Sequence, residues 1–247
     1  MRIGDGVVNI TDYKNNKVLK IWHQRHKEKG YKKFVYDGIV DLSLWKNSPQ
    51  VCFFLKEAHL KEDLESENLC NMLKDYDIWR MWKVVADWIY GICNTTISYI
   101  PAFTKIRNDN EDNPNKRVRS SAIINIKKSN GMPSSEHNDL MRYVGEDSDL
   151  IKEQFNEIDP QIIVCGNTAY YFELIFGYNP KQRNSFATYN GQKILHKDFL
   201  EKGYVWAGNT LIIDFCHPAN RFDRKGKYYA LCALYQQALI GRKEGGL

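Results

Sequence analysis

The sequence predicts an α/β protein, a three-layer helix/sheet/helix sandwich around a central four-stranded parallel sheet. The first observation is a set of four short apolar runs, at residues 51–55, 122–124, 161–165 and 211–216. Runs of this kind are typical of strands buried on both faces, as in parallel sheets covered by helices. The second observation is that a helical segment follows each run. The resulting alternation of strands and helices implies right-handed crossovers.

Helices are expected between the strands and after the last one. Residues 78–92 place Trp79 and Trp82 at helical spacing with further apolar residues, and this pattern ends at Gly91. The other helices are expected over residues 140–158, 167–176 and 228–240. The polar segment 104–121, centred on Pro114, is expected to be a loop. The pair Asn190-Gly191 favours a hairpin.

The chain organisation fits a single domain over residues 1–247. Residues 1–48 form an N-terminal helical extension, with a helix that ends near Gly30, packed on a core of residues 49–242. A length of 247 residues with 43% hydrophobic and 26% charged residues is ordinary for a globular protein. The formal net charge of +5 permits a polyanionic partner without requiring one.

The cysteines and the apolar segments bear on the cellular compartment. Six cysteines occur without a C-x-x-C pair, and Cys52, Cys165 and Cys216 lie within predicted strands. They are interpreted as reduced core residues of a cytoplasmic protein. The first residues lack the apolar region of a signal peptide, and no apolar stretch reaches the roughly 20 residues of a membrane span. No membrane partner is therefore expected.

Polar residues follow the predicted strands where each strand ends. Glu57 follows the first strand, Asn125 follows the second, and His217-Pro218 follows the last. Ligands of open α/β sheets lie beyond the carboxyl ends of the strands, so a carboxylate, an amide and an imidazole would meet at one edge. Each residue also has an ordinary explanation: a solvated turn glutamate, an amide that braces a loop, and a turn histidine. Their shared edge favours a site.

Four short motifs around these residues occur in a fixed order. They are Lys56-Glu57-Ala58-His59, then Asn125-Ile126-Lys127-Lys128-Ser129, then the Pro-x-x-Ile-x-x-x-Gly-x-x-Ala-like stretch 160–169, and finally His217-Pro218-Ala219. Over about residues 50–240 the chain resembles the uracil-DNA glycosylase superfamily, whose motifs are similar in kind and order. The resemblance implies a uracil-DNA glycosylase-like fold, and a DNA partner with an extruded target base.

The resemblance also implies roles for individual residues. Glu57 would assist the attack of water or stabilise the cationic sugar, Asn125 would read the flipped base, and His217 would hydrogen-bond the departing base. Trp79, or Trp82 as second choice, would stack on the base, although an amphipathic helix explains both tryptophans as well; His59 would be a further base contact. Contacts to the DNA would come from Lys127, Lys128, Asn167, Asn220, Arg221 and Arg224. A solvated helix start explains the last two arginines equally well.

Departures from the family pattern narrow the expectation. Ser129 stands at the position of a cluster cysteine and the N-terminal cysteine pair is missing, so no iron–sulfur cluster is expected. No tyrosine closely follows Glu57 to exclude bulky pyrimidines, which leaves room for a base larger than uracil. The expected function is that of a monofunctional, monomeric glycosylase without a cofactor. It would act on uracil or a modified pyrimidine, as some bacterial members do in defence against phage DNA.

Two other functions are also compatible with the sequence. One is a non-catalytic nucleic-acid-binding relative that keeps the fold but not the activity. The other is a metal-dependent nuclease that uses Asp41, Glu57 and Asp63 as ligands. The pair His23-x-x-His26 lacks further ligands nearby and is interpreted as a surface pair. No phosphate-binding loop of the P-loop or Rossmann kind occurs, and no metal site is expected.

Overall fold

The structure is a computed structural model that describes residues 16–31, 33–58, 66–75, 78–108, 113–129, 131, 135–180, 187–189, 192–194, 202–221 and 223–244. The strands are β1 (Phe34–Tyr36), β2 (Gly38–Ile39), β3 (Val51–Glu57), β4 (Ser66–Asn68), β5 (Ala122–Lys127), β6 (Ile162–Gly166), β7 (Ala187–Tyr189), β8 (Gln192–Ile194), β9 (Tyr204–Ala207) and β10 (Thr210–Phe215). The helices are α1 (Lys17–Glu28), α2 (Leu42–Lys46), α3 (Leu69–Asp75), α4 (Arg80–Asn94), α5 (Lys105–Asn108), α6 (Pro114–Arg119), α7 (His137–Ile158), α8 (Ala169–Phe176) and α9 (Arg224–Glu244).

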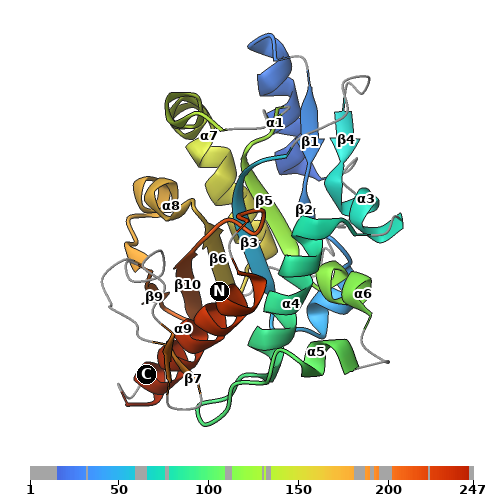
Figure 1. The fold of residues 1–247 in the computed structure, drawn as a ribbon. Coiled ribbons are helices and arrows are strands. Elements are labelled where there is room, and N and C mark those ends of the chain that lie inside the picture. Colours follow the sequence, from blue (N-terminus) through green and yellow to red (C-terminus); the bar gives the residue numbers. More distant parts are fainter. Residues whose placement is uncertain are drawn as a thin grey trace.

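The main sheet has six strands in the order β2-β5-β3-β6-β10-β9 (Figure 1). The central strands β5, β3, β6 and β10 pair in parallel, and they contain the four predicted runs. The expectation of four parallel strands is corrected at both edges, because β2 and β9 pair antiparallel to their neighbours. The sheet is therefore mixed. The added strands are two and four residues long, too short to show a hydrophobic period in the sequence.

Helices cover both faces of this sheet (Figure 1). Side chains alternate along β3, so that Phe53 and Leu55 pack with α3, α4, α6 and α9, whereas Cys52 and Phe54 pack with α1, α7 and α8. Because both faces are covered, the central strands carry almost no polar residues until they end. The predicted α/β class with helices around a sheet is confirmed in this form.

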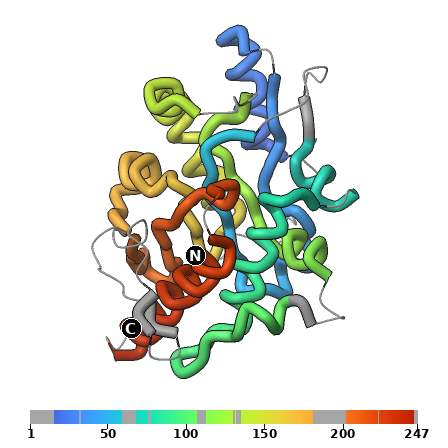
Figure 2. The backbone as a smooth tube through the Cα atoms, viewed as in Figure 1, coloured from blue at the N-terminus to red at the C-terminus, as the bar shows by residue number. Residues whose placement is uncertain are grey.

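Helices α4 and α9 lie side by side on one face, as the tube in Figure 2 shows. The sequence pattern ends the first of these helices at Gly91, but α4 continues to Asn94. Gly91 lies at the contact instead: a Cβ at this position would be 2.4 Å from Sγ of Cys232 and 2.8 Å from the ring of Tyr228. The glycine allows two helices to approach closely and does not terminate one.

The segment predicted to be a loop over residues 104–121 contains two short helices. Asn113 caps α6, since its side chain accepts a hydrogen bond from the backbone N–H of Asn115 at 2.8 Å. Pro114 occupies the first turn, where its missing N–H leaves no helical hydrogen bond unmade. Val118 is buried in the core on the α4 face. Tertiary packing thus stabilises a helix too short to have a period.

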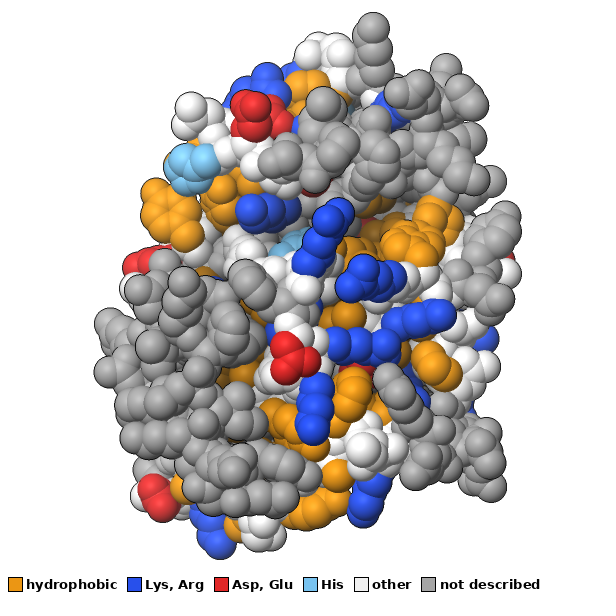
Figure 3. Space-filling view, viewed as in Figure 1, with side chains coloured by type: hydrophobic (Ala, Val, Ile, Leu, Met, Phe, Trp, Pro, Cys, Tyr) orange, Lys and Arg blue, Asp and Glu red, His pale blue; other side chains and the backbone are white. Residues whose placement is uncertain are grey.

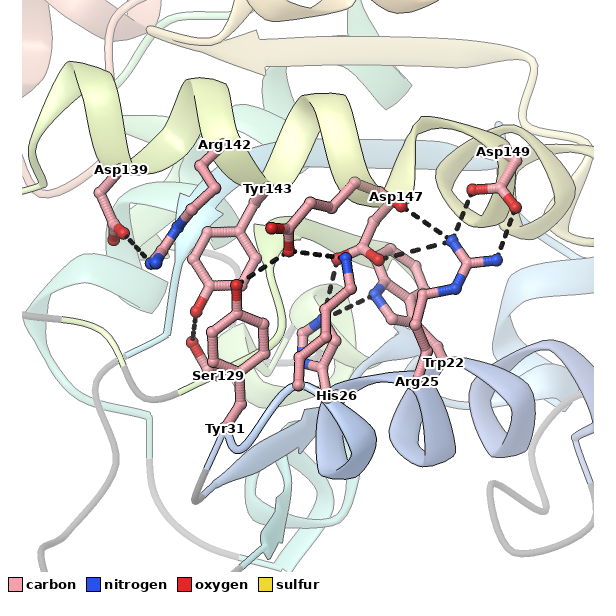
Figure 4. A network of polar contacts seen from close by, with 12 residues as sticks. Trp22, Arg25, His26, Tyr31, Ser129, Asp139, Arg142, Tyr143, Asp147 and Asp149 are labelled. Atoms are coloured by element: carbon pink, nitrogen blue, oxygen red, sulfur yellow. Dashed lines mark hydrogen bonds and ion pairs between the residues drawn. The ribbon is translucent and has the colours of Figure 1, made fainter.

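The N-terminal extension packs closely on the core, and its strand β2 belongs to the main sheet. Figure 4 shows α1 and α7 side by side, with polar side chains from each pointing toward the other. Nε2 of His26 lies 2.8 Å from Oδ2 of Asp147, and both side chains are buried. Arg25 donates two hydrogen bonds of 2.7 Å to Asp149 nearby. The interpretation of His26 as a surface residue is therefore wrong; it joins two helices.

Two smaller findings complete the fold. Strands β7 and β8 pair antiparallel with Tyr189 opposite Gln192, as a hairpin requires, whereas the predicted turn pair Asn190-Gly191 lies outside the described residues. Within the described ranges, no helix has the length and apolar character needed to cross a bilayer.

Candidate active site

The ends of the central strands meet at one edge of the sheet. Glu57 at the end of β3 is paired with Lys127 at the end of β5. Gly166 at the end of β6 is paired with Phe215 at the end of β10. Since these strands are parallel, the residues that follow them lie on the same side of the molecule. Glu57 and the turn at His217 are therefore both delivered to this edge, as their sequence context predicts.

The turn that carries His217 is packed against the neighbouring strand end. A Cβ at Gly166 would lie 2.7 Å from a methyl group of Leu55, 3.4 Å from Cδ of Pro218 and 3.6 Å from Cα of His217, so a larger residue would require Leu55 to shift. The backbone N–H of Asn167 donates to the carbonyl of Phe215 at 2.8 Å. Asn167 has a φ of 57°, a left-handed conformation uncommon for residues other than glycine. The close packing fixes where the imidazole is presented.

The state of the His217 ring follows from its contacts. The backbone N–H of Ala219 donates to Nδ1 at 3.2 Å, so Nδ1 is an acceptor and the neutral ring carries its proton on Nε2. Burial is the largest cause that lowers the pKa of His217. The cations Lys56 and Lys227 act in the same direction, and the three effects together bring this pKa to about 4. At neutral pH the ring is uncharged and can donate a hydrogen bond through Nε2.

The carboxylate of Glu57 is held by a lysine that bridges two acids. Nζ of Lys127 lies 3.2 Å from Oε2 of Glu57 and 2.7 Å from Oδ2 of Asp139, which comes from the first turn of α7. The side chain of Glu57 is only 6% exposed. Burial lowers the pKa of Lys127, but the contacts with Asp139 and Glu57 outweigh this effect and raise it. Lys127 is therefore an ammonium group that fixes the carboxylate.

A close backbone approach also confines Glu57. The N–H of Gly131 donates to the carbonyl of Ala58 at 2.8 Å. A Cβ on Gly131 would lie 2.7 Å from Cγ of Glu57, so a larger residue at this position would push the carboxylate aside. Lys127 was predicted as a DNA contact; its observed contacts are instead the two carboxylates.

Asn125 lies near this edge but is engaged within the protein. Its backbone N–H and its Nδ2 donate to the same oxygen of Asp37, at 2.8 and 3.0 Å, and its side chain is buried. The other oxygen of Asp37 accepts from Nζ of Lys128 and from Nε2 of Gln154. The buried acid thus ties β5 to the N-terminal extension and α7.

Lys128 does not reach a phosphate. Its side chain is 0% exposed, paired with Asp37, and its Nζ lies 4.6 Å from the centre of the Trp22 ring. The expectation that Lys128 contacts DNA is corrected: two lysines follow one another at the strand end, and successive side chains point to opposite faces. One of them reaches Glu57, whereas the other enters the core.

The two predicted stacking residues differ in exposure. Trp82 is 2% exposed in the core, so it is not a stacking surface for a base, and that second choice is corrected. Trp79 is 46% exposed and precedes α4. It lines a pocket of about 400 Å³ whose other wall is the segment Pro218–Arg221. Glu57, Asn125 and His217 are not among the lining residues, so Trp79 does not share a pocket with them.

The predicted DNA contacts of the last loop surround this pocket. Asn220, Arg221 and Arg224 all line it, and Arg221 is exposed. Nε of Arg224 lies 2.5 Å from Oδ2 of Asp87, so this guanidinium is already paired with α4. Figure 3 shows Lys and Arg side chains gathered across the middle of this face, over the beginnings of α4 and α9. Asn167, also predicted, is exposed at the same strand edge.

The metal-ligand hypothesis is contradicted by position. Asp41 caps α2 and pairs with Arg119 at 2.8 Å, next to the end of β2 that faces the start of β5. Glu57 pairs with the other end of β5, five residues along and therefore roughly 16 Å away. Asp63 and His59 lie outside the described residues. Across the part of the chain that the structure describes, no group of three His, Cys, Asp or Glu side chains could hold a metal ion.

Two acids of this region were missed by sequence reasoning. Asp139 lies in the first turn of α7, one residue before the predicted helix 140–158. The helix that follows the second strand begins near the carboxyl edge of the sheet, and this position is the sequence signal that could have identified Asp139. Asp37 follows β1 in the extension and carries no periodic or motif signal. Comparison with known proteins gives no match, either to a family model or to a curated sequence.

Proposed function

We propose that this protein is a monofunctional DNA glycosylase of the uracil-DNA glycosylase type, with the three-layer fold of that superfamily. One observation carries the proposal. A neutral histidine with its proton on Nε2 and a carboxylate held by a lysine are presented at the same sheet edge. A leaving base gains negative charge and the sugar gains positive charge, so this pair of groups matches the charge development of N-glycosidic bond cleavage.

The reaction needs the target nucleotide outside the base stack. The C1′–N bond breaks and its electron pair leaves with the base, where Nε2–H of His217 donates a hydrogen bond to a base oxygen. Water adds to C1′ while Glu57 accepts one of its protons. The products are a free base and an abasic sugar. The charged Lys127 has no lone pair for attack on C1′, which supports the monofunctional route.

Basic side chains support DNA as the partner. The face drawn in Figure 3 carries lysines and arginines over the beginnings of α4 and α9, next to the turn that presents His217. Cations of this kind position a phosphate backbone without reading sequence. We assign Asn125 no base contact, because its Nδ2 donates to Asp37. The substrate in the proposal is uracil or a modified pyrimidine.

The same observation on Asn125 favours a second candidate. The Asn125 amide is buried and bonded to Asp37, so it does not offer hydrogen-bonding groups to a flipped base. A non-catalytic nucleic-acid-binding relative would not need such a contact. This candidate predicts DNA binding without base release.

An assay for abasic sites separates the two candidates. Oligonucleotides carrying uracil, hypoxanthine, hydroxymethylcytosine or its glucosylated form are incubated with excess protein in EDTA, and abasic sites are revealed by alkali. We expect cleavage of one pyrimidine substrate, reduced roughly 10²–10⁴-fold in Glu57→Gln and in His217→Ala. Glu153→Gln, an exposed change on α7, is the matched control. DNA binding with no release from any substrate supports the non-catalytic candidate.

A further inference from the structure

The pocket beside Trp79 combines an apolar wall with a cluster of cations. Trp79, Met81 and Val84 line it from the beginning of α4. The opposite wall, Pro218–Arg221, directly follows His217. Its volume of about 400 Å³ falls within the range of about 300–1,000 Å³ common for small-molecule sites. The pocket is therefore adjacent to the candidate active site and large enough for a ligand of its own.

The Trp79 ring is held in place while much of its surface stays exposed. Its centre lies 6.1 Å from that of Trp82 in an edge-to-face arrangement, at an interplanar angle of 75°. Trp82 is itself buried in the core, so Trp79 packs against a ring that the core holds in place. A large, partly exposed aromatic ring on a rigid support is the platform on which unpaired bases stack in single-strand binding proteins.

The charge of the pocket is one-sided. Arg80, Arg221, Arg224 and Lys227 line it, and no acidic side chain among the described residues does. Arg224 is paired with Asp87, and Lys227 is buried with its Nζ 2.5 Å from the carbonyl of Asn220. Within the described ranges, Arg80 and Arg221 form no ion pair, and both are exposed. Two guanidinium groups are thus available at the mouth, a suitable pair for a phosphate.

We propose that this pocket binds an unpaired nucleotide, with its base against Trp79 and its phosphate between Arg80 and Arg221. An inorganic anion alone would leave the apolar wall unused, and an apolar ligand would leave the guanidinium groups unused. A nucleotide uses both. The pocket lies next to the His217 turn, so we infer that the bound nucleotide is a neighbour of the target nucleotide in the same DNA strand. The inference that the nucleotide comes from DNA rests on the proposed function. The protein then prefers DNA that is unpaired beside the target.

A binding experiment without any excisable base tests this site separately from catalysis. Fluorescence anisotropy measures a labelled oligodeoxythymidylate hexamer, a duplex containing it, and competition by free dTMP. We expect the single strand to bind at least tenfold more tightly than the duplex. Trp79→Ala should weaken single-strand binding roughly 5- to 100-fold and Trp79→Phe much less. Arg221→Ala should weaken it and flatten its salt dependence.

The controls keep the outcomes distinct. Lys152→Ala removes an exposed cation from α7, on the other face of the sheet, and should leave binding unchanged. The oligonucleotides contain no excisable base, so a protein that releases no base can still confirm the pocket. If dTMP competes at concentrations comparable to those of the single strand, the pocket binds a nucleotide as proposed, but its natural ligand is a free nucleotide and not part of a DNA strand. No binding, or binding insensitive to Trp79→Ala and Arg221→Ala, would overturn the proposal.

Discussion

His217 is the residue on which the proposed chemistry depends most. Burial, as the largest cause, and the cations Lys56 and Lys227 together lower its pKa to about 4. The unfolded chain binds a proton at the ordinary histidine pKa of about 6.5. Between these two values the unfolded state holds the extra proton, so this residue makes the free energy of unfolding rise with pH across that window.

We predict that NMR of ¹⁵N-labelled protein places the titration of His217 near pH 4, with the proton of the neutral ring on Nε2. The same lowered pKa predicts that the ring stays neutral between pH 8 and about pH 5, so protonation of His217 should not change the rate of base release across this range. A midpoint near 6.5, or a proton on Nδ1, would contradict the assigned state of the ring.

Lys127 is the second residue with a clear expected behaviour. Its contacts with Asp139 and Glu57 raise its pKa, so it carries no free lone pair at neutral pH. We predict that borohydride traps no covalent complex between the wild-type protein and a substrate oligonucleotide, with a known bifunctional lyase as positive control. A trapped complex that disappears in Lys127→Gln would show that this lysine attacks the sugar.

Asp37 tests the buried polar cluster. Its carboxylate accepts from Lys128, Asn125 and Gln154, and Lys128 is fully buried. Asp37→Asn leaves that ammonium without a counter-charge, and we predict a loss of about 3 kcal/mol in the free energy of unfolding by urea. Asp149→Asn breaks the exposed pair with Arg25 and should change it by less than about 1 kcal/mol. Equal effects of the two changes would contradict this account.

At the scale of elements, two helical glycines should respond in opposite ways to substitution by alanine, because one lies at a contact between helices and the other is exposed. We predict that Gly91→Ala destabilises the fold by about 1–3 kcal/mol, because its Cβ would meet Cys232 and Tyr228 where α4 crosses α9. Gly145 is an exposed glycine in α7 with no atom near the site of a Cβ. Gly145→Ala should stabilise by roughly 0.5–1 kcal/mol through helix propensity. Thermal unfolding of both variants measures the contrast, and changes of the same sign would refute it.

At the scale of the whole molecule, elements long enough to show a hydrophobic period could be predicted from the sequence, and shorter elements could not. The four apolar runs became the central strands, and residues 137–158 and 224–244 form helices close to the predicted ranges. Strands β2 and β9 and helix α6 are too short for a period, and their stability comes from packing against the rest of the fold. Local signals cannot report such packing.

The sequence predicts where the residues of the candidate site lie better than it predicts which residues they contact. Strand ends carry Glu57 and His217 to one edge because parallel strands end together. Asn125 and Lys128 both donate to Asp37, which is some 90 residues away in sequence. Asp139 on α7 pairs with Lys127, the lysine that holds Glu57. Such long-range pairs leave no spacing pattern in one sequence, so Lys128 and Trp82 were predicted as surface contacts although they are buried.

The measurement that tests the central claim most directly is mass spectrometry of the small molecules released from substrate DNA in EDTA. We predict one free base in amounts equal to the abasic sites formed, and none with Glu57→Gln. Released nucleotides or oligonucleotide fragments, or a free base formed equally by Glu57→Gln, would contradict hydrolysis of the N-glycosidic bond at this site.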